Sequence, residues 1–255
     1  MPEATDIATA IATEVAKQIP VKDVYNDAVK PATQQVGNLV GDVAKTILLV
    51  LAPLQITGAL QDRFRSFLDK SVRRVSEEDR LPPPPQILGP VLEGIRYEPE
   101  DSPIVEMFSR LLSSSMDQKK IHNAHPAFSQ IIKQLSADEA ALLKAMWQLW
   151  EREGRSFRQQ FTQDYDRNSN RFSNSKIELD ELPREDLIFP ENIEFYGQHL
   201  YALGITAFYD SANQEAIIST EKDGSKIQTG TRIFKELRFT DVGKKFMLAV
   251  NDKKL

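Results

Sequence analysis

The chain has 255 residues, of which 41% are apolar, so it can build a core in one large domain or two modest ones. The formal net charge of −5 argues against broad electrostatic binding to nucleic acid or anionic lipid. No cysteine is present, which excludes disulfides, thiolate catalysis and cysteine-ligated metal centres and fits a reducing compartment. The first residues carry acids within an apolar pattern rather than the basic start of a signal peptide. We therefore expect a cytoplasmic protein.

An N-terminal helical region is predicted for residues 1–80, because apolar residues recur there at helical spacing between breaks at Pro20 and Pro31. Its most apolar stretch, 46–60, is shorter than the roughly 20 residues of a membrane-spanning helix and contains Pro53. We expect a buried core helix here. The candidate residues for protein contact or membrane insertion are Ile47, Leu48, Leu49, Val50, Leu51 and Leu54.

The sequence "LPPPP", residues 81–85, predicts a stiff extended spacer and the first domain boundary. A helical middle region, 81–136, follows this hinge. One of its helices is expected to begin at Ser102 as N-cap with Pro103 at the first helical position. The three serines at 113–115 are expected at the solvated end of that helix.

Two of the three histidines, His122 and His125, lie close together and raise the question of a metal site. Pro126 disfavours helical geometry at His125, so we expect His125 at a helix start. A zinc or iron site needs three or four converging ligands, and the third histidine, His199, is distant in sequence. We therefore expect no metal and no other cofactor.

Residues 137–255 are predicted to form a winged-helix-like domain with a small antiparallel sheet. Ser136 and Glu139 form a capping box at the start of a helix that extends to Trp150. A helix near 190–204, three short strands and a closing helix complete the pattern. The fold class expected for the whole chain is therefore mainly α.

A polar insertion at about 154–186 interrupts this predicted domain. The four-residue spacing of Phe157, Phe161 and Tyr165 suggests that the preceding helix continues, and the residues after it read as a surface loop. Part of this stretch resembles a calcium-binding loop, but Ser169 replaces the required glycine and Ser175 the bidentate glutamate. We expect a solvated loop without calcium.

A winged helix could read DNA, but the helix that would enter the groove carries Glu191 and Glu194 and no Lys or Arg. The predicted wing is more basic, and its candidate contact residues are Lys222, Lys226 and Arg232. The charge pattern favours contact with a protein over contact with DNA.

Several segments in order resemble the abortive-infection alpha family of bacterial proteins. They are "VYNDAVKPATQQVGNLVGDV" (24–43), "LPPPPQILGPVLEGIRY" (81–97), "MFSRLLSSSMD" (107–117), "HPAFSQIIKQLSADEAALL" (125–143), "LYALGI" (200–205) and "LRFTDVGKKF" (237–246). The resemblance implies a role in defence against phage by halting growth of the infected cell. It supplies no catalytic residues, and it marks His125 and Pro126 as a structural landmark.

The favoured hypothesis is a non-enzymatic antiviral protein that acts through protein contacts, with another protein or with itself, or through a change of oligomeric state. One alternative is a membrane-perturbing effector that uses the apolar N-terminal helices; a further one is a winged-helix DNA-binding regulator. The chain lacks the common nucleotide-binding and hydrolase motifs, and no small-molecule substrate is evident. An enzyme built on the acidic residues Asp180, Glu181, Glu185 and Asp186 is the least favoured hypothesis.

Overall fold

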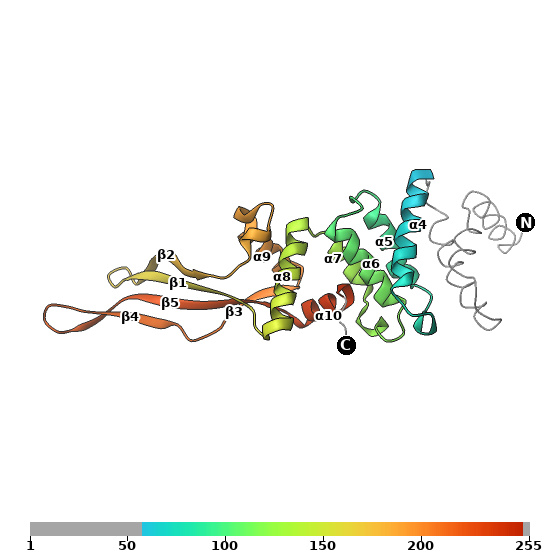
Figure 1. Cartoon of the computed structure of the whole chain (residues 1–255). Coiled ribbons are helices and arrows are strands. Elements are labelled where there is room, and N and C mark those ends of the chain that lie inside the picture. Colours follow the sequence, from blue (N-terminus) through green and yellow to red (C-terminus); the bar gives the residue numbers. More distant parts are fainter. Residues whose placement is uncertain (1–57, 252–255) are drawn as a thin grey trace, which may run out of the picture. The chain divides into compact units, whose positions relative to one another are not determined.

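The computed structural model describes residues 58–251, which divide into two compact units. The first comprises the described residues up to Leu135 and those from Lys245 onward, and the second comprises Ser136–Lys244. Together the described residues form seven α-helices and one five-stranded antiparallel sheet (Figure 1). The fold is therefore mixed α/β, and the prediction of a mainly α chain with only a small sheet is wrong.

The first unit is helical. It contains α4 (Gly58–Arg73), η1 (Glu77–Asp79), α5 (Pro85–Ile95), α6 (Pro103–Ser115), η2 (Ile121–Asn123), α7 (Pro126–Ile132) and the second half of α10 (Asp241–Val250). Two helix starts confirm the predictions from sequence. Ser102 accepts a hydrogen bond from the Ile104 amide at 3.2 Å, and His125 Nδ1 accepts one from the Ala127 amide at 3.1 Å. His125 thus satisfies one of the free amides at the start of a helix.

The serines of α6 are buried in the first unit, so the prediction that they lie at a solvated helix end is wrong. Ser114 is 4% exposed and Ser115 is fully buried. Ser113 Oγ donates to the Ser71 carbonyl of α4, and Ser114 Oγ donates to the Ala249 carbonyl of α10. Small hydroxyl side chains allow helices to approach closely while each buried hydroxyl finds a backbone acceptor.

The second unit begins with α8 (Ala137–Glu153) and carries the sheet. The remaining elements are β1 (Phe157–Asp166), β2 (Arg171–Asp180), η3 (Arg184–Asp186), η4 (Pro190–Asn192), α9 (Ile193–Ala202), β3 (Thr206–Asp210), β4 (Glu215–Thr220) and β5 (Lys226–Phe239). The strand order is β2-β1-β5-β3, and β4 pairs with the part of β5 that precedes the β3 pairing. The tips of the β1–β2 and β4–β5 hairpins extend away from α8 and α9 (Figure 1). Accordingly, nine of the ten residues of β2 are exposed.

The polar stretch 154–186 contains a β-hairpin rather than a continued helix and a loop, which corrects the prediction. Gly154, at φ 67°, ends α8 in the left-handed conformation that glycine adopts most readily. Residues four apart share a face in a strand as well as in a helix, so the spacing of Phe157, Phe161 and Tyr165 fits both structures. In the hairpin turn, Asp166 accepts hydrogen bonds from the Asn168 amide and the Ser169 hydroxyl. One carboxylate of the calcium-like pattern is thus engaged in the turn itself.

Candidate interaction surface

Two buried carboxylates at the first turn of α8 join that helix to α9. Asp138 is 4% exposed and Glu139 is 2% exposed. Glu139 completes the predicted capping box, because its Oε2 accepts from the Ser136 amide at 2.8 Å while its own amide donates to Ser136 Oγ at 3.2 Å. Its other oxygen lies 2.5 Å from Nδ1 of His199 on α9. The positive end of the α8 dipole favours negative charge at both positions.

Asp138 holds the segment that leads into α9. Its Oδ1 accepts from the Ile188 amide at 2.8 Å, and its Oδ2 accepts from the Phe189 amide at 2.9 Å and from the Tyr196 hydroxyl at 2.8 Å. Burial acts to raise the pKa of Asp138, but the hydrogen bonds from Ile188, Phe189 and Tyr196 outweigh it and lower the pKa below its usual value of 3.8. The carboxylate is therefore charged at neutral pH and fixes the backbone at 188–189.

Although this backbone is fixed, its side chains face solvent. Ile188 is 69% exposed, Phe189 is 53% exposed, and Phe195 in the first turns of α9 is 61% exposed. The Phe195 ring stacks on His199, with 6.0 Å between centroids and 16° between planes. We call Ile188, Phe189 and Phe195 together the aromatic surface, after its two phenylalanine rings. Exposed clusters of large apolar side chains on soluble proteins commonly mark interaction sites.

Acidic residues flank Ile188, Phe189 and Phe195 in the sequence, and we call them the border of the aromatic surface. Glu185, Asp186, Glu191 and Glu194 are all exposed. Arg184 connects the elements that carry them, because its guanidinium donates to Asp180 at 2.8 Å, to the Pro190 carbonyl at 3.1 Å and to Glu194 at 3.0 Å. Among the described residues, Glu185, Asp186 and Glu191 have no ion-pair partner. The border of the surface is therefore negatively charged.

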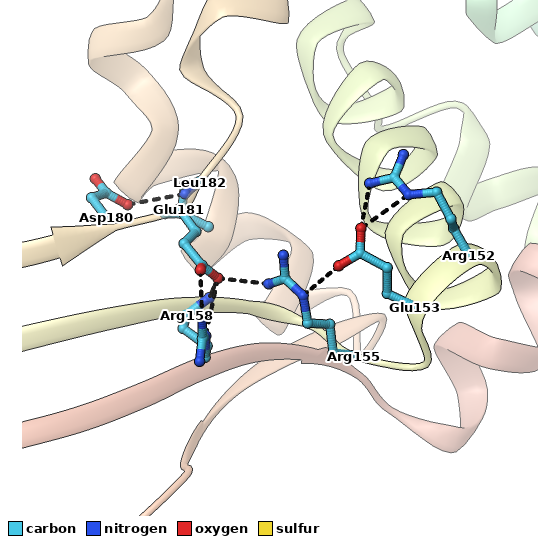
Figure 2. Close-up of polar contacts among 7 residues, drawn as sticks. All are labelled: Arg152, Glu153, Arg155, Arg158, Asp180, Glu181 and Leu182. Carbon is cyan, nitrogen blue, oxygen red and sulfur yellow. Dashed lines mark hydrogen bonds and ion pairs between the residues drawn. The ribbon is translucent and has the colours of Figure 1, made fainter.

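A second polar group fixes the base of the β1–β2 hairpin (Figure 2). Glu181, just after β2, lies 2.7 Å from Nη2 of Arg158 and 2.8 Å from Nη1 of Arg155, and Arg155 in turn pairs with Glu153 at the end of α8 at 2.6 Å. The hydrogen bond from Arg158 is the main reason that the pKa of Glu181 falls to about 2. The alternation of arginine and carboxylate, extended by Arg152, stabilises the junction of helix and hairpin.

Two of the four acidic residues of the enzyme hypothesis are engaged in contacts within the fold, and the other two are exposed. Asp180 accepts from Gln159 and Arg184, while Glu181 is held by Arg155 and Arg158. Glu185 and Asp186 lie in solvent on η3. In the part of the chain that the structure describes, no group of three or more His, Asp or Glu residues is arranged to hold a metal ion.

The predicted wing residues have different surroundings. Lys222 and Lys226 are exposed at the β4–β5 turn and at the start of β5. Arg232, in the middle of β5, pairs with Glu178 of β2 at 2.8 Å and with Glu215 of β4 at 3.4 Å. Its charge is therefore compensated within the sheet.

The six apolar candidates of the N-terminal region, Ile47 to Leu54, lie outside the described residues. Between residues 58 and 251, no helix has both the length and the apolar character needed to cross a membrane.

Reasoning from the sequence did not identify the aromatic surface. The segment "DLIFPENIEF" alternates buried and exposed apolar residues without a regular period, since Leu187 and Ile193 are buried while Ile188 and Phe195 are exposed. The sequence does hold one indication that a segment is anchored at this helix start. The capping box "SADE" requires only Ser136 and Glu139, yet it also contains a second acid, Asp138. Such a residue in the first turn of a helix is a candidate for anchoring a neighbouring segment.

The comparisons with known proteins identify a family that matches most of the chain. The model of a family described as abortive infection alpha matches residues 58–250. This range contains both described units, including the carboxylates of α8 and the aromatic surface. The searches of curated proteins and of solved structures found no match.

Proposed function

Because the chain belongs to the abortive infection alpha family, we propose that it is a bacterial antiviral defence protein that acts without catalysis, by binding another protein through the aromatic surface. Family membership supports the role in abortive infection. Binding as the mode of action is supported by one observation above all. Ile188 and Phe189 are exposed on backbone whose amides a buried carboxylate holds, and Phe195 is exposed beside Tyr196, whose hydroxyl donates to the same carboxylate.

A surface of this kind is suited to recognition because its shape exists before the partner arrives. Asp138 and the capped start of α8 fix the amides of Ile188 and Phe189, so little backbone entropy remains to be lost on binding. Aromatic side chains supply most of the energy at many protein interfaces. Asp138 holds backbone amides, and Asp180 and Glu181 pair with arginine, which supports a structural role for these three carboxylates.

Phage plaque counts in bacteria with and without the protein test this proposal. We expect the wild-type chain to protect against at least one phage, and we expect the variant Phe189→Ser/Phe195→Ser to lose protection. Tyr97, which is 83% exposed in the first unit, provides the matched control, and Tyr97→Ser should protect like the wild type. Immunoblots and circular dichroism verify that each variant accumulates and folds.

Two results would contradict the proposal. The first is full protection by Phe189→Ser/Phe195→Ser at equal protein levels, which would exclude the aromatic surface from the function. The second is the absence of protection by the wild-type chain against a broad panel of phages, which would count against a defence role.

A further inference from the structure

We propose that the aromatic surface binds a basic amphipathic segment of a partner protein, in which apolar side chains are flanked by Lys or Arg. This inference rests on the proposed function and adds the chemistry of the partner. It follows from the charge around the three exposed apolar side chains and from the absence of cations near them in the sequence.

Three of the four bordering carboxylates, those of Glu185, Asp186 and Glu191, have no ion-pair partner among the described residues. After Arg184, the next Lys or Arg in the sequence is Lys222, so residues 185–221 contain neither. Arg184 itself is shared between Asp180 and Glu194. The exposed carboxylates of Glu185, Asp186 and Glu191 therefore give this region a negative potential, which attracts a cationic partner and raises its association rate.

The same charges disfavour the other classes of partner. Phosphate groups of nucleic acids or of anionic lipids would be repelled by the acidic border. A symmetric dimer through this surface would place the carboxylates of one copy against those of the other, because a two-fold interface presents the same patch on both subunits. A segment with Lys or Arg beside its apolar side chains meets both the apolar and the electrostatic requirement.

Exposed apolar and acidic residues alternate over a short stretch of the chain, from Glu185 to Phe195. Phe189 and Phe195 belong to consecutive elements, since the Phe189 carbonyl accepts from the Asn192 amide just before α9. Glu191 lies between them on η4, and Arg184 ties η3, which carries Glu185, to the Pro190 carbonyl. This mixture of exposed rings and carboxylates matches the apolar and basic faces of an amphipathic helix.

Fluorescence anisotropy with the full chain and two labelled model peptides tests the inference. One peptide has Leu on one face and Lys on the other over about four helical turns, and the second has Glu in place of Lys. We expect the Lys peptide to bind and the Glu peptide to fail. We expect Phe189→Ser/Phe195→Ser to weaken binding of the Lys peptide at least tenfold.

Two charge variants separate local from general electrostatics. Glu185→Gln/Glu191→Gln should weaken binding severalfold and reduce its dependence on salt. Glu77→Gln/Glu78→Gln, two exposed residues on η1 of the first unit, changes the net charge equally and should bind like the wild type. All four positions are exposed, so the variants should share one unfolding midpoint.

Several outcomes would overturn the inference. The inference is wrong if the Glu peptide binds as tightly as the Lys peptide. It is also wrong if Glu77→Gln/Glu78→Gln weakens binding as much as Glu185→Gln/Glu191→Gln, or if Phe189→Ser/Phe195→Ser binds the Lys peptide like the wild type. A wild-type dimer in light scattering that Phe189→Ser/Phe195→Ser dissociates would identify a second copy as the occupant. Vesicle binding with the same dependence on the variants would identify a membrane as the occupant.

If the serine variant loses phage protection while the peptide results fail, the inference is wrong and the proposed function stands. If the peptide results hold while protection is unchanged, the proposed function is wrong.

Discussion

The substitution Asp138→Asn tests whether one buried carboxylate holds the aromatic surface in place. The asparagine side chain has nearly the same shape but only one acceptor oxygen. Oriented to keep the bonds from Phe189 and Tyr196, it turns its NH2 group toward the Ile188 amide, so two donors face each other. An unsatisfied buried amide costs about 1–3 kcal/mol, and the lost charge at the α8 N-terminus adds about 0.5 kcal/mol. We expect the free energy of unfolding to fall by about 2–3 kcal/mol.

Urea unfolding and amide hydrogen exchange together measure this effect. The Ile188 and Phe189 amides should exchange much faster in Asp138→Asn, whereas the amides of the first unit should not change under native conditions. Tyr196→Phe removes one of the three hydrogen bonds and should cost about 1 kcal/mol of the free energy of unfolding.

Because folding lowers the pKa of Asp138, the stabilisation from this carboxylate is complete above pH 3.8 and is lost as the pH falls through the folded-state pKa. The difference between wild type and variant should therefore shrink in acid. Unchanged protection of the two amides in Asp138→Asn would refute the reasoning.

The remaining predictions concern close packing and one ion pair. A Cβ at Gly243 would lie 2.0 Å from the Ile205 carbonyl oxygen. The resulting overpacking should cost about 1–3 kcal/mol, which outweighs the gain of about 1 kcal/mol in helix propensity, so the free energy of unfolding in urea should fall in Gly243→Ala. The substitution of its exposed neighbour, Val242→Ala, is the control. A Cβ at Gly94 would lie 2.4 Å from the buried Phe108 ring, and Gly94→Ala should lower the thermal midpoint in scanning calorimetry. Glu181→Gln loses a carboxylate whose pKa falls from 4.5 to about 2, which corresponds to about 3 kcal/mol before solvent screening reduces it to about 1 kcal/mol. In a pH series of unfolding, the Glu181→Gln difference should be complete above pH 4.5 and vanish toward pH 2; a constant difference across that range would contradict this account.

The helix starts of the first unit could be predicted because they depend on local chemistry. Ser102 and His125 cap helices that begin with proline, and the fixed backbone of proline together with a side-chain acceptor is sufficient to specify such a start. The capping box of Ser136 and Glu139 is equally local and is present as predicted. In each case the interacting atoms lie within three residues of one another in the sequence.

The β1–β2 hairpin could not be predicted in this way because its strands are specified by their partners. Phe161 pairs with Ile177 on one side and with Ile233 on the other, far along the chain. The four-residue spacing from Phe157 fits a strand and a helix alike, and the polar residues between give no β signal of their own. The pairing of β1 with β5 decides between strand and helix, and the sequence of the β1 segment alone does not specify that pairing.

The acidic residues of the second unit show why the aromatic surface could not be predicted from the sequence either. Asp138 and Glu185 are both acids in helical segments, yet one is buried with three donors and the other faces solvent. Their roles differ because burial is decided by the packing of α9 against α8, not by the local sequence. It follows that the two kinds of acid should respond differently to substitution. We expect a change at Asp138 to alter both folding and the proposed binding, and a change at Glu185 or Glu191 to alter the proposed binding alone. Variants at the exposed acids are therefore the ones that can separate the recognition of a partner from the stability of the fold.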